Sequence, residues 1–268
     1  MPIDRIQIGD LSVSRLIIGG NPYSGFSHQS REKDQEMRHY YTTARIKEVM
    51  RQAEELGVNT QIARADHHIM RVLLEYRDEG GAIQWIAQTC SELATICQGV
   101  GSAIAGGANA CFIHGGRMDY LLARDELDEV PAAIAMIKNA DIPAGIAGHD
   151  PKVFEWAEEH LDVDFYMCSH YNPFHRDERG EHIPGMAEKF DPEERDTMVE
   201  LIGRLSKPVI HYKVMAGGRT DPKDTFAFIA KHLRPQDAVC VGIYPKDHPG
   251  MLEEDLRLLE ESLRGATS

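Results

Sequence analysis

Short apolar runs alternate with longer amphipathic stretches along nearly the whole chain. Eight of the apolar runs have the length and composition of buried strands. They begin at RLIIGG, NTQIA, IQWIAQ, ACFIH, AGIAG, DFYMCS, PVIHY and AVCVGI. Helical periodicity follows nearly every run, over residues 44–56, 69–79, 92–105, 129–140, 151–161, 192–206, 222–233 and 251–263. This alternation predicts an α/β fold of the (β/α)8 TIM-barrel type.

Three further features refine the predicted barrel. Residues 5–13 (RIQIGDLSV) precede the first strand and predict a β-hairpin that plugs the barrel floor. An open doubly wound sheet also alternates strands and helices, but GGNPYSG matches its glycine-rich first turn poorly. No linker or repeat is visible, which predicts a single domain over 1–268. The irregular segment 174–190 is polar and contains glycine and proline, as expected of a lid or rim loop.

Composition and charge narrow the range of partners. Apolar residues make up 42% of the chain, and no apolar run reaches the roughly 20 residues of a membrane span. The N-terminus lacks the features of a signal peptide, and five cysteines favour reduced thiols in a cytoplasmic protein. The net charge of −14 argues against nucleic acid or an anionic membrane as a partner. We therefore expect a small-molecule substrate, and a homo-oligomer is compatible with the sequence.

The histidines are distributed unevenly along this pattern. Ten of the thirteen follow predicted strands, and His39, His160 and His232 lie in stretches with helical periodicity. In barrel enzymes the chemistry takes place where the strands end. The distribution therefore predicts one polar pocket lined by imidazole rings.

Six segments occur in the same order as in a known superfamily. They are VSRLIIGGN, GVNTQIARAD, FIH, YNPF, HYKVMAGG and GMLEEDLRLL. Together they resemble the aldo-keto reductases over nearly the whole length of the chain. The resemblance implies a (β/α)8 barrel. Where the reaction is also retained, it implies NADP-dependent reduction of a carbonyl group.

The residues that carry the reductase reaction are mostly replaced. Of the Asp–Tyr–Lys–His set of the family, only the histidine is retained, as His114. The other three positions fall on Ile62, His67 and Thr89, or Gln88 after a shift of one residue. The positions that hold the nicotinamide carboxamide, the adenine and the 2′-phosphate fall on Ala147, Gly148, Cys168, Asp255 and His248. General acid catalysis without a matched proton donor loses about 10²–10⁴-fold, so we expect the scaffold to be inherited without the hydride chemistry.

Four of the strand-end histidines form a candidate metal site. His114 faces inward in the resembling family, and Cys168 and His170 share the parity of an inward-facing glutamine there. The candidate ligands lie on four consecutive strands: His114, His149, His170 and His211. Such a set suits a divalent metal, either Zn, Fe, Ni or Co, with a carboxylate from Asp66, Glu92 or Asp150. Alternatively, each imidazole makes a hydrogen bond in a polar pocket, and Tyr212 rather than His211 has the inward parity.

Other polar residues at the predicted rim suit a polyhydroxylated ligand. The candidate substrate-binding residues are Asn21, Tyr23, Arg64, Tyr171, Asn172 and Tyr212. Lys213 is a catalytic candidate because a lysine at a barrel mouth can meet an anion or polarise a carbonyl. Asp66 is a further candidate, although it is as well placed to pair with Arg64. Gly217, Gly218 and Lys246 lie where such barrels often bind a phosphate of a ligand or cofactor.

The sequence supports three functional hypotheses. The first is a non-redox enzyme of isomerase, lyase or hydrolase type that acts on a sugar-like or hydroxy-carbonyl compound, with His114 and His170 at its centre. The second is an NADP-dependent reductase in which His67 replaces the tyrosine. The third is a catalytically inactive barrel that binds a metabolite.

Overall fold

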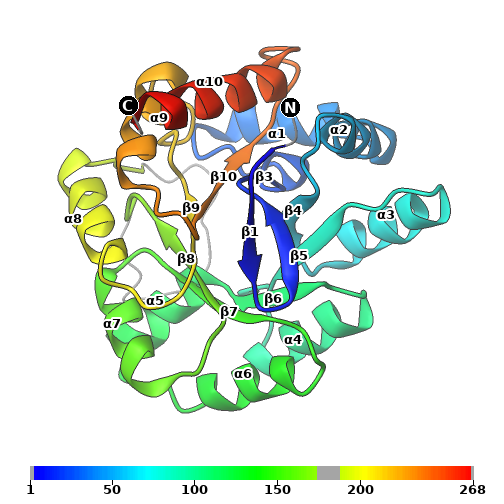
Figure 1. The fold of residues 1–268 in the computed structure, drawn as a ribbon. Coiled ribbons are helices and arrows are strands. Elements are labelled where there is room, and N and C mark those ends of the chain that lie inside the picture. Colours follow the sequence, from blue (N-terminus) through cyan, green and yellow to red (C-terminus); the bar gives the residue numbers. More distant parts are fainter. Residues whose placement is uncertain (1–2, 174–187, 267–268) are drawn as a thin grey trace.

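Eight parallel strands form a closed barrel in the computed structural model, which describes residues 3–173 and 188–266. The strands are β3 (Leu16–Gly19), β4 (Thr60–Arg64), β5 (Gln84–Gln88), β6 (Ala110–Ile113), β7 (Ala144–Gly148), β8 (Phe165–Ser169), β9 (Val209–Tyr212) and β10 (Ala238–Gly242). Each strand pairs with its sequence neighbours, and β10 closes the barrel on β3. Helices surround the barrel (Figure 1). The predicted fold and all eight predicted strands are confirmed.

The predicted hairpin is also present. β1 (Arg5–Ile8) pairs antiparallel with β2 (Leu11–Ser14), and the two lie across one end of the barrel (Figure 1). The apolar side chains of Ile6, Ile8 and Val13 are buried against the residues of the barrel interior. Burial of this apolar surface fixes the hairpin in place and closes the barrel floor.

The helices agree with the predicted periodicity, and three further elements are present among the described residues. The predicted helices are α2 (Thr43–Glu55), α3 (His67–Asp78), α4 (Ile96–Ala105), α6 (Val130–Lys138), α7 (Pro151–His160), α8 (Pro192–Ile202), α9 (Pro222–His232) and α10 (Met251–Ala266). The additional elements are α1 (Arg31–Tyr40), α5 (Gly115–Ala123) and a 3-10 turn, η1 (Pro22–Ser24). Two glycines open α5, and glycine is a poor helix former, so the sequence signal for this helix is weak.

Alternation along the strands separates the barrel interior from the helix-facing layer. Phe165 and Met167 of β8 pack in the interior, whereas Cys168 packs among the surrounding helices. The prediction that Cys168 and His170 face inward is therefore wrong, because the inward-facing positions of β8 are shifted by one residue from the predicted ones. On β9, Tyr212 packs against the interior cluster, so the suspected inward parity of Tyr212 is confirmed and His211 lies on the helix side.

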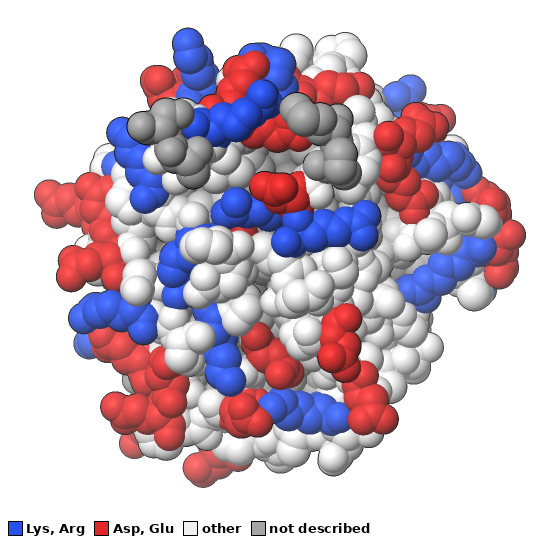
Figure 2. Space-filling model, viewed as in Figure 1, with Lys and Arg blue, Asp and Glu red and all other residues white. Residues whose placement is uncertain are grey.

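The surface carries charges of both signs (Figure 2), and the cysteines form no disulfide. Acidic and basic side chains are interspersed on the face shown in Figure 2. In the described part of the chain, no helix combines the length and apolar character needed to cross a bilayer. All five cysteines are free thiols, and burial raises the pKa of Cys111 and that of Cys240 to about 12. Most of the predicted lid, residues 174–187, lies outside the described residues.

Candidate active site

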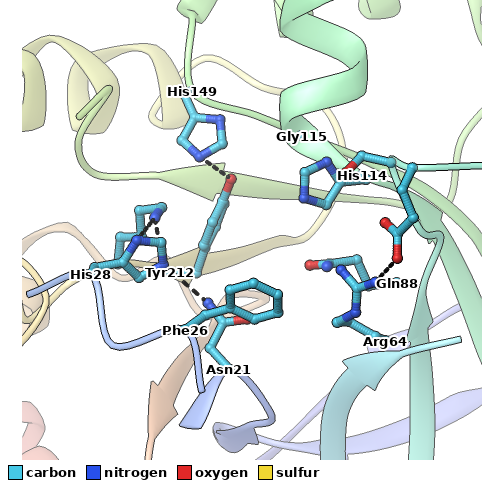
Figure 3. A pocket seen from close by; sticks show the side chains of 12 residues that line it. Asn21, Phe26, His28, Arg64, Gln88, His114, Gly115, His149 and Tyr212 are labelled. Carbon is cyan, nitrogen blue, oxygen red and sulfur yellow. Dashed lines mark hydrogen bonds and ion pairs between the residues drawn. The ribbon is translucent and has the colours of Figure 1, made fainter. Parts of the chain in front are cut away.

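A cavity of about 380 Å³ opens at the end of the barrel where the strands finish. It is lined by Asn21, Phe26, His28, Arg64, Gln88, Ser91, Glu92, His114, Gly115, His149, Tyr212 and Lys213 (Figure 3). Six of these twelve residues are the last residue of a strand or follow it directly: Arg64, Gln88, His114, His149, Tyr212 and Lys213. Because parallel strands all end at the same rim, side chains distant in the sequence meet there.

Asp119, His149 and Tyr212 form a hydrogen-bonded chain in the cavity wall. The Asp119 Oδ2 atom lies 2.6 Å from His149 Nδ1, and the amide of His149 donates to Asp119 Oδ1 at 2.9 Å. The side chains of Asp119 and His149 are 6% and 4% exposed. A carboxylate can only accept, so in the neutral ring Nδ1 carries the proton and Nε2 is an acceptor. The Tyr212 hydroxyl lies 3.2 Å from Nε2 and 3.3 Å from the carbonyl oxygen of Gly148, so both are acceptors within reach of its proton (Figure 3).

The backbone leaves just enough room for this chain. Gly115 follows His114 and begins α5, the helix that carries Asp119. A Cβ atom at Gly115 would lie 2.9 Å from the Tyr212 hydroxyl oxygen and 3.2 Å from His149 Cε1. A larger residue at position 115 would therefore displace the tyrosine or the imidazole.

A second cluster joins Lys213, His28 and Glu188. The Lys213 Nζ atom lies 3.0 Å from His28 Nε2, and His28 Nδ1 lies 2.8 Å from Glu188 Oε1. The Glu188 side chain is 2% exposed. Lys213 and His28 both have left-handed backbones, with φ of 56° and 59°. This conformation is uncommon for residues other than glycine, and such strain is concentrated at functional sites.

The opposite wall carries Arg64, Gln88 and His114 (Figure 3). Arg64 donates to Asp66 Oδ2 at 3.1 Å, forms an ion pair with Glu92 and lies over the Phe26 ring. These partners hold the guanidinium at the cavity edge. The His114 Nδ1 atom accepts a hydrogen bond from the Arg117 amide at 3.3 Å, which caps α5. This wall therefore presents several donors to a bound polar molecule.

The four histidines expected to share a metal do not meet in one place. His114 and His149 line the cavity, but His170 and His211 are buried on the outer side of β8 and β9. Among the described residues, no group of three or more His, Cys, Asp or Glu side chains is arranged to hold a metal ion. The predicted convergence is therefore wrong, because it placed His170 and His211 on the inward face.

His170 and His211 belong to a separate buried chain. His170 Nε2 lies 2.9 Å from His211 Nδ1, and His211 Nε2 lies 3.6 Å from Asp237 Oδ2. Asp237 also binds the Arg234 side chain and accepts from the Val209 amide. Burial, with smaller contributions from His211 and Arg195, lowers the pKa of His170 well below its ordinary value. The hydrogen-bonded pair of His170 and His211 therefore links β8, β9 and the segment before β10.

Five other candidates lie away from the cavity lining. Asp66 caps α3 by accepting from the Ile69 amide, and His67 is the exposed first residue of that helix. Tyr23 is buried against another tyrosine of the core, with ring centroids 4.9 Å apart. Tyr171 packs against Phe190 near a smaller cavity of about 210 Å³. The Asn172 amide donates to a carboxylate of α8.

The predicted phosphate residues are separated by the structure. Gly217 and Gly218, with φ of 65° and 79°, line a groove of about 500 Å³ that shares its mouth with the cavity. Lys246 instead pairs with Glu36 at 3.5 Å. The far part of the groove contains the carboxylates of Asp247, Glu254 and Asp255, and burial raises the pKa of Asp255 to about 7. Asp247 forms an ion pair with Lys33 at 2.7 Å and Glu254 contacts His248 at 2.7 Å, so these two carboxylates already have partners.

Several cavity residues were not singled out from the sequence. His28 is one of the strand-end histidines but the sequence suggests no particular role for it, and Glu188 lies near the end of the irregular segment 174–190. Asp119 lies in α5, which was not predicted. Asp119 lies four residues after Gly115, so the two positions share a face of α5. The sequence indicates this proximity only where the helix itself is predicted.

Comparisons with known proteins agree on the fold. A candidate aldo-keto reductase of Pseudomonas aeruginosa is 15% identical over 97% of this chain and 96% of its own, with a TM-score of 0.66. The holo form of a Bacillus halodurans aldo-keto reductase is 14% identical, covering 100% and 95%, with a TM-score of 0.60. A truncated 3-deoxy-D-arabino-heptulosonate 7-phosphate synthase of Thermotoga maritima is 15% identical over 99% and 93%, with a TM-score of 0.57.

The chain has the fold of the aldo-keto reductases. No protein-family model matches the sequence, and a search of curated proteins finds no match. Within the aldo-keto reductase fold, Ile62 is part of the apolar barrel interior. Gln88 rather than Thr89 lines the cavity, and the Thr89 hydroxyl accepts from the His114 amide. Of the two residues expected at the lysine position of the family, only Gln88 lines the cavity.

We predict that the buried pair of His170 and His211 makes folding stability dependent on pH. The unfolded state binds a proton at His170 below its ordinary pKa of about 6.5, whereas the folded state does not. The free energy of unfolding should therefore fall as the pH drops below about 6.5. His170→Gln should reduce this slope and destabilise the fold by about 1–3 kcal/mol at neutral pH, because His211 loses its partner.

Urea unfolding across this pH range measures both effects. A stability that is constant between neutral and mildly acidic pH would contradict the prediction. So would an unchanged slope in His170→Gln.

Proposed function

We propose that this protein is an enzyme that moves a proton on a carbon next to a carbonyl group in a small, sugar-like compound. The reaction is of the isomerase or lyase type and transfers no hydride. The observation that carries this proposal is the chain from Asp119 through His149 to the Tyr212 hydroxyl at the cavity. The barrel fold, which is shared with reductases and with a sugar-phosphate synthase, is compatible with such a substrate.

The hydrogen-bonded groups of Tyr212, His149 and Asp119 follow one another in the order that a proton relay needs. Tyr212 takes the substrate proton on its oxygen as its own proton passes to His149 Nε2. The buried carboxylate of Asp119 stabilises the imidazolium that results, as an acidic residue does in other triads. Return of the proton to the neighbouring carbon completes an isomerisation. Loss of a leaving group from the enolate completes a lyase reaction.

The remaining walls of the cavity suit the substrate. Its volume of about 380 Å³ lies within the range of small-molecule sites. Arg64, Gln88 and Asn21 supply hydrogen-bond donors for hydroxyl groups. The Lys213 ammonium places positive charge where an enolate oxygen would form, and such fixed charge is a large source of catalysis.

Exchange of substrate hydrogen with solvent tests the proposal without knowledge of the product. A panel of aldoses, ketoses and their phosphates in D₂O should include a compound whose α-hydrogen the protein exchanges, as followed by proton NMR. Tyr212→Phe and His149→Gln should each reduce the exchange rate by about 10²-fold or more, because each interrupts the relay. Exchange that survives in Tyr212→Phe at the wild-type rate would contradict the mechanism.

Gly115→Ala tests the packing of the relay and removes none of its polar groups. The added methyl should reduce exchange by about 10²-fold, since it displaces Tyr212 or His149. The methyl would also lie 3.2 Å from the Gly148 backbone nitrogen, so the free energy of unfolding should fall by about 1–3 kcal/mol, as is typical of overpacking. Gly101→Ala is the matched control, since its Cβ would lie 3.7 Å from Met136 in ordinary contact. Equal activity of the two variants would count against the proposed geometry.

An NADP-dependent reductase is the second candidate. It is favoured by the fold and by the groove that extends from the cavity toward α10. Outside the cavity, the described lining of that groove contains no lysine or arginine that could pair with a phosphate, which disfavours a cofactor with several phosphates.

We predict no saturable binding of NADPH up to about 0.1 mM in a fluorescence titration, which is a weak affinity on the usual scale. NADP-dependent oxidation or reduction of the same sugar panel should also be absent. Tight NADPH binding together with turnover would favour the reductase over the isomerase or lyase.

A further inference from the structure

We propose that the groove beside the cavity binds an organic amine in its ammonium form, and that the Asp255 carboxylate accepts hydrogen bonds from the ammonium group. The groove has a volume of about 500 Å³, shares part of its lining with the cavity and extends to α10. The inference goes beyond the proposed function and does not depend on it, because it concerns a second binding site with a ligand of its own.

Asp255 occupies a position where the pattern of α10 would place an apolar residue. Leu252 lies three residues before it and Leu259 four residues after it, and all three side chains are buried. Positions at this spacing share one face of a helix, and here that face packs on the core. Asp255 is 5% exposed, so a carboxylate takes the place of a leucine on the inner face of the helix.

The Asp255 carboxylate has no partner in the part of the chain that the structure describes. No side chain or backbone N–H there donates to its oxygen atoms. Burial, with a smaller contribution from the charge of Glu254, raises its pKa to about 7. Burial of a charge is costly unless the charge is paired. Because Asp255 lines the groove, a molecule bound in the groove can supply the partner.

The other carboxylates at this end of the groove differ from Asp255. Asp247 binds Lys33 and is half-exposed, and Glu254 binds His248 at the surface. Ion pairs that face water in this way contribute little to binding or stability. The buried Asp255 is therefore the group to which a cation in the groove would bind most strongly.

The rest of the groove indicates the class of cation. Its lysine and arginine, Lys213 and Arg64, lie in the part shared with the cavity, so the α10 end attracts positive charge. Much of the remaining lining is apolar and includes Pro22, Met37, Val214, Met215, Pro222, Val241 and Met251. Among the described residues no three acidic, histidine or cysteine side chains are arranged to hold a metal ion. An ammonium group on a hydrocarbon chain or ring fits this lining, because its apolar part is buried while its charge is paired.

Paired probes with the same apolar part test the site. n-Hexylammonium and benzylammonium ions are compared with n-hexanol and benzyl alcohol in titrations at pH 8, followed by saturation-transfer difference NMR. Each ammonium ion should bind about tenfold or more tightly than its alcohol, because hydrogen bonds between two charged groups are the stronger ones. Equal affinities for ammonium ion and alcohol would overturn the inference. So would the absence of binding of either ammonium ion up to about 10 mM, a very weak affinity on the usual scale.

Asp255→Asn keeps the size of the side chain and removes its charge. The variant should bind n-hexylammonium about tenfold or more weakly than the wild type. Glu254→Gln is the matched control, because this neighbouring carboxylate is 43% exposed and already contacts His248. Its effect should be less than about threefold, as for other exposed charges. Unchanged affinity in Asp255→Asn, or equal losses in the two variants, would overturn the inference.

Thermal unfolding gives a readout that needs no ligand. At pH 8 the wild type buries an ionised carboxylate without a partner, so Asp255→Asn should unfold at a higher temperature. Addition of n-hexylammonium should raise the unfolding temperature of the wild type more than that of the variant. A lower unfolding temperature in Asp255→Asn would indicate a structural partner for the carboxylate and overturn the inference. None of these results bears on the proton relay, which the exchange experiment tests separately.

Discussion

The hydrogen bond between the buried carboxylate of Asp119 and His149 is the interaction on which the site depends. It fixes the tautomer of the neutral imidazole, so that the second nitrogen is an acceptor 3.2 Å from the Tyr212 hydroxyl. Asp119 also accepts the amide of His149, which joins the first turns of α5 to the end of β7. One carboxylate therefore sets both the chemistry of the histidine and the position of its backbone.

The barrel determines which side chains can join this arrangement. Alternate residues of each strand face the axis, and near the rim these are polar: Arg64, Gln88, His114, His149 and Tyr212. The intervening residues face the helices, where His170 and His211 form their own buried pair. A shift of one residue would exchange these two sets. The strand register is therefore as important to the site as the identity of its residues.

Much of the fold could be predicted from the sequence, because strand and helix periodicities are local signals. The eight strands and the hairpin follow from them, as does the presence of His114 and His149 at the rim. The error at His170 came from the parity that the resemblance assigned to β8, where Met167 rather than Cys168 fills the interior. The contacts of Asp119 and Glu188 could not be predicted, because each joins segments that only the closed barrel brings together. His28 and Glu188 are separated by 160 positions.

Nitrogen NMR of the histidine side chains tests the central claim most directly, with His149 assigned by comparison with His149→Gln. The account predicts that neutral His149 carries its proton on Nδ1, with the strongly deshielded proton signal of a short bond to a carboxylate, and that Nε2 is unprotonated. A proton on Nε2 of the neutral ring, or an imidazole that exchanges freely between the two forms, would contradict it.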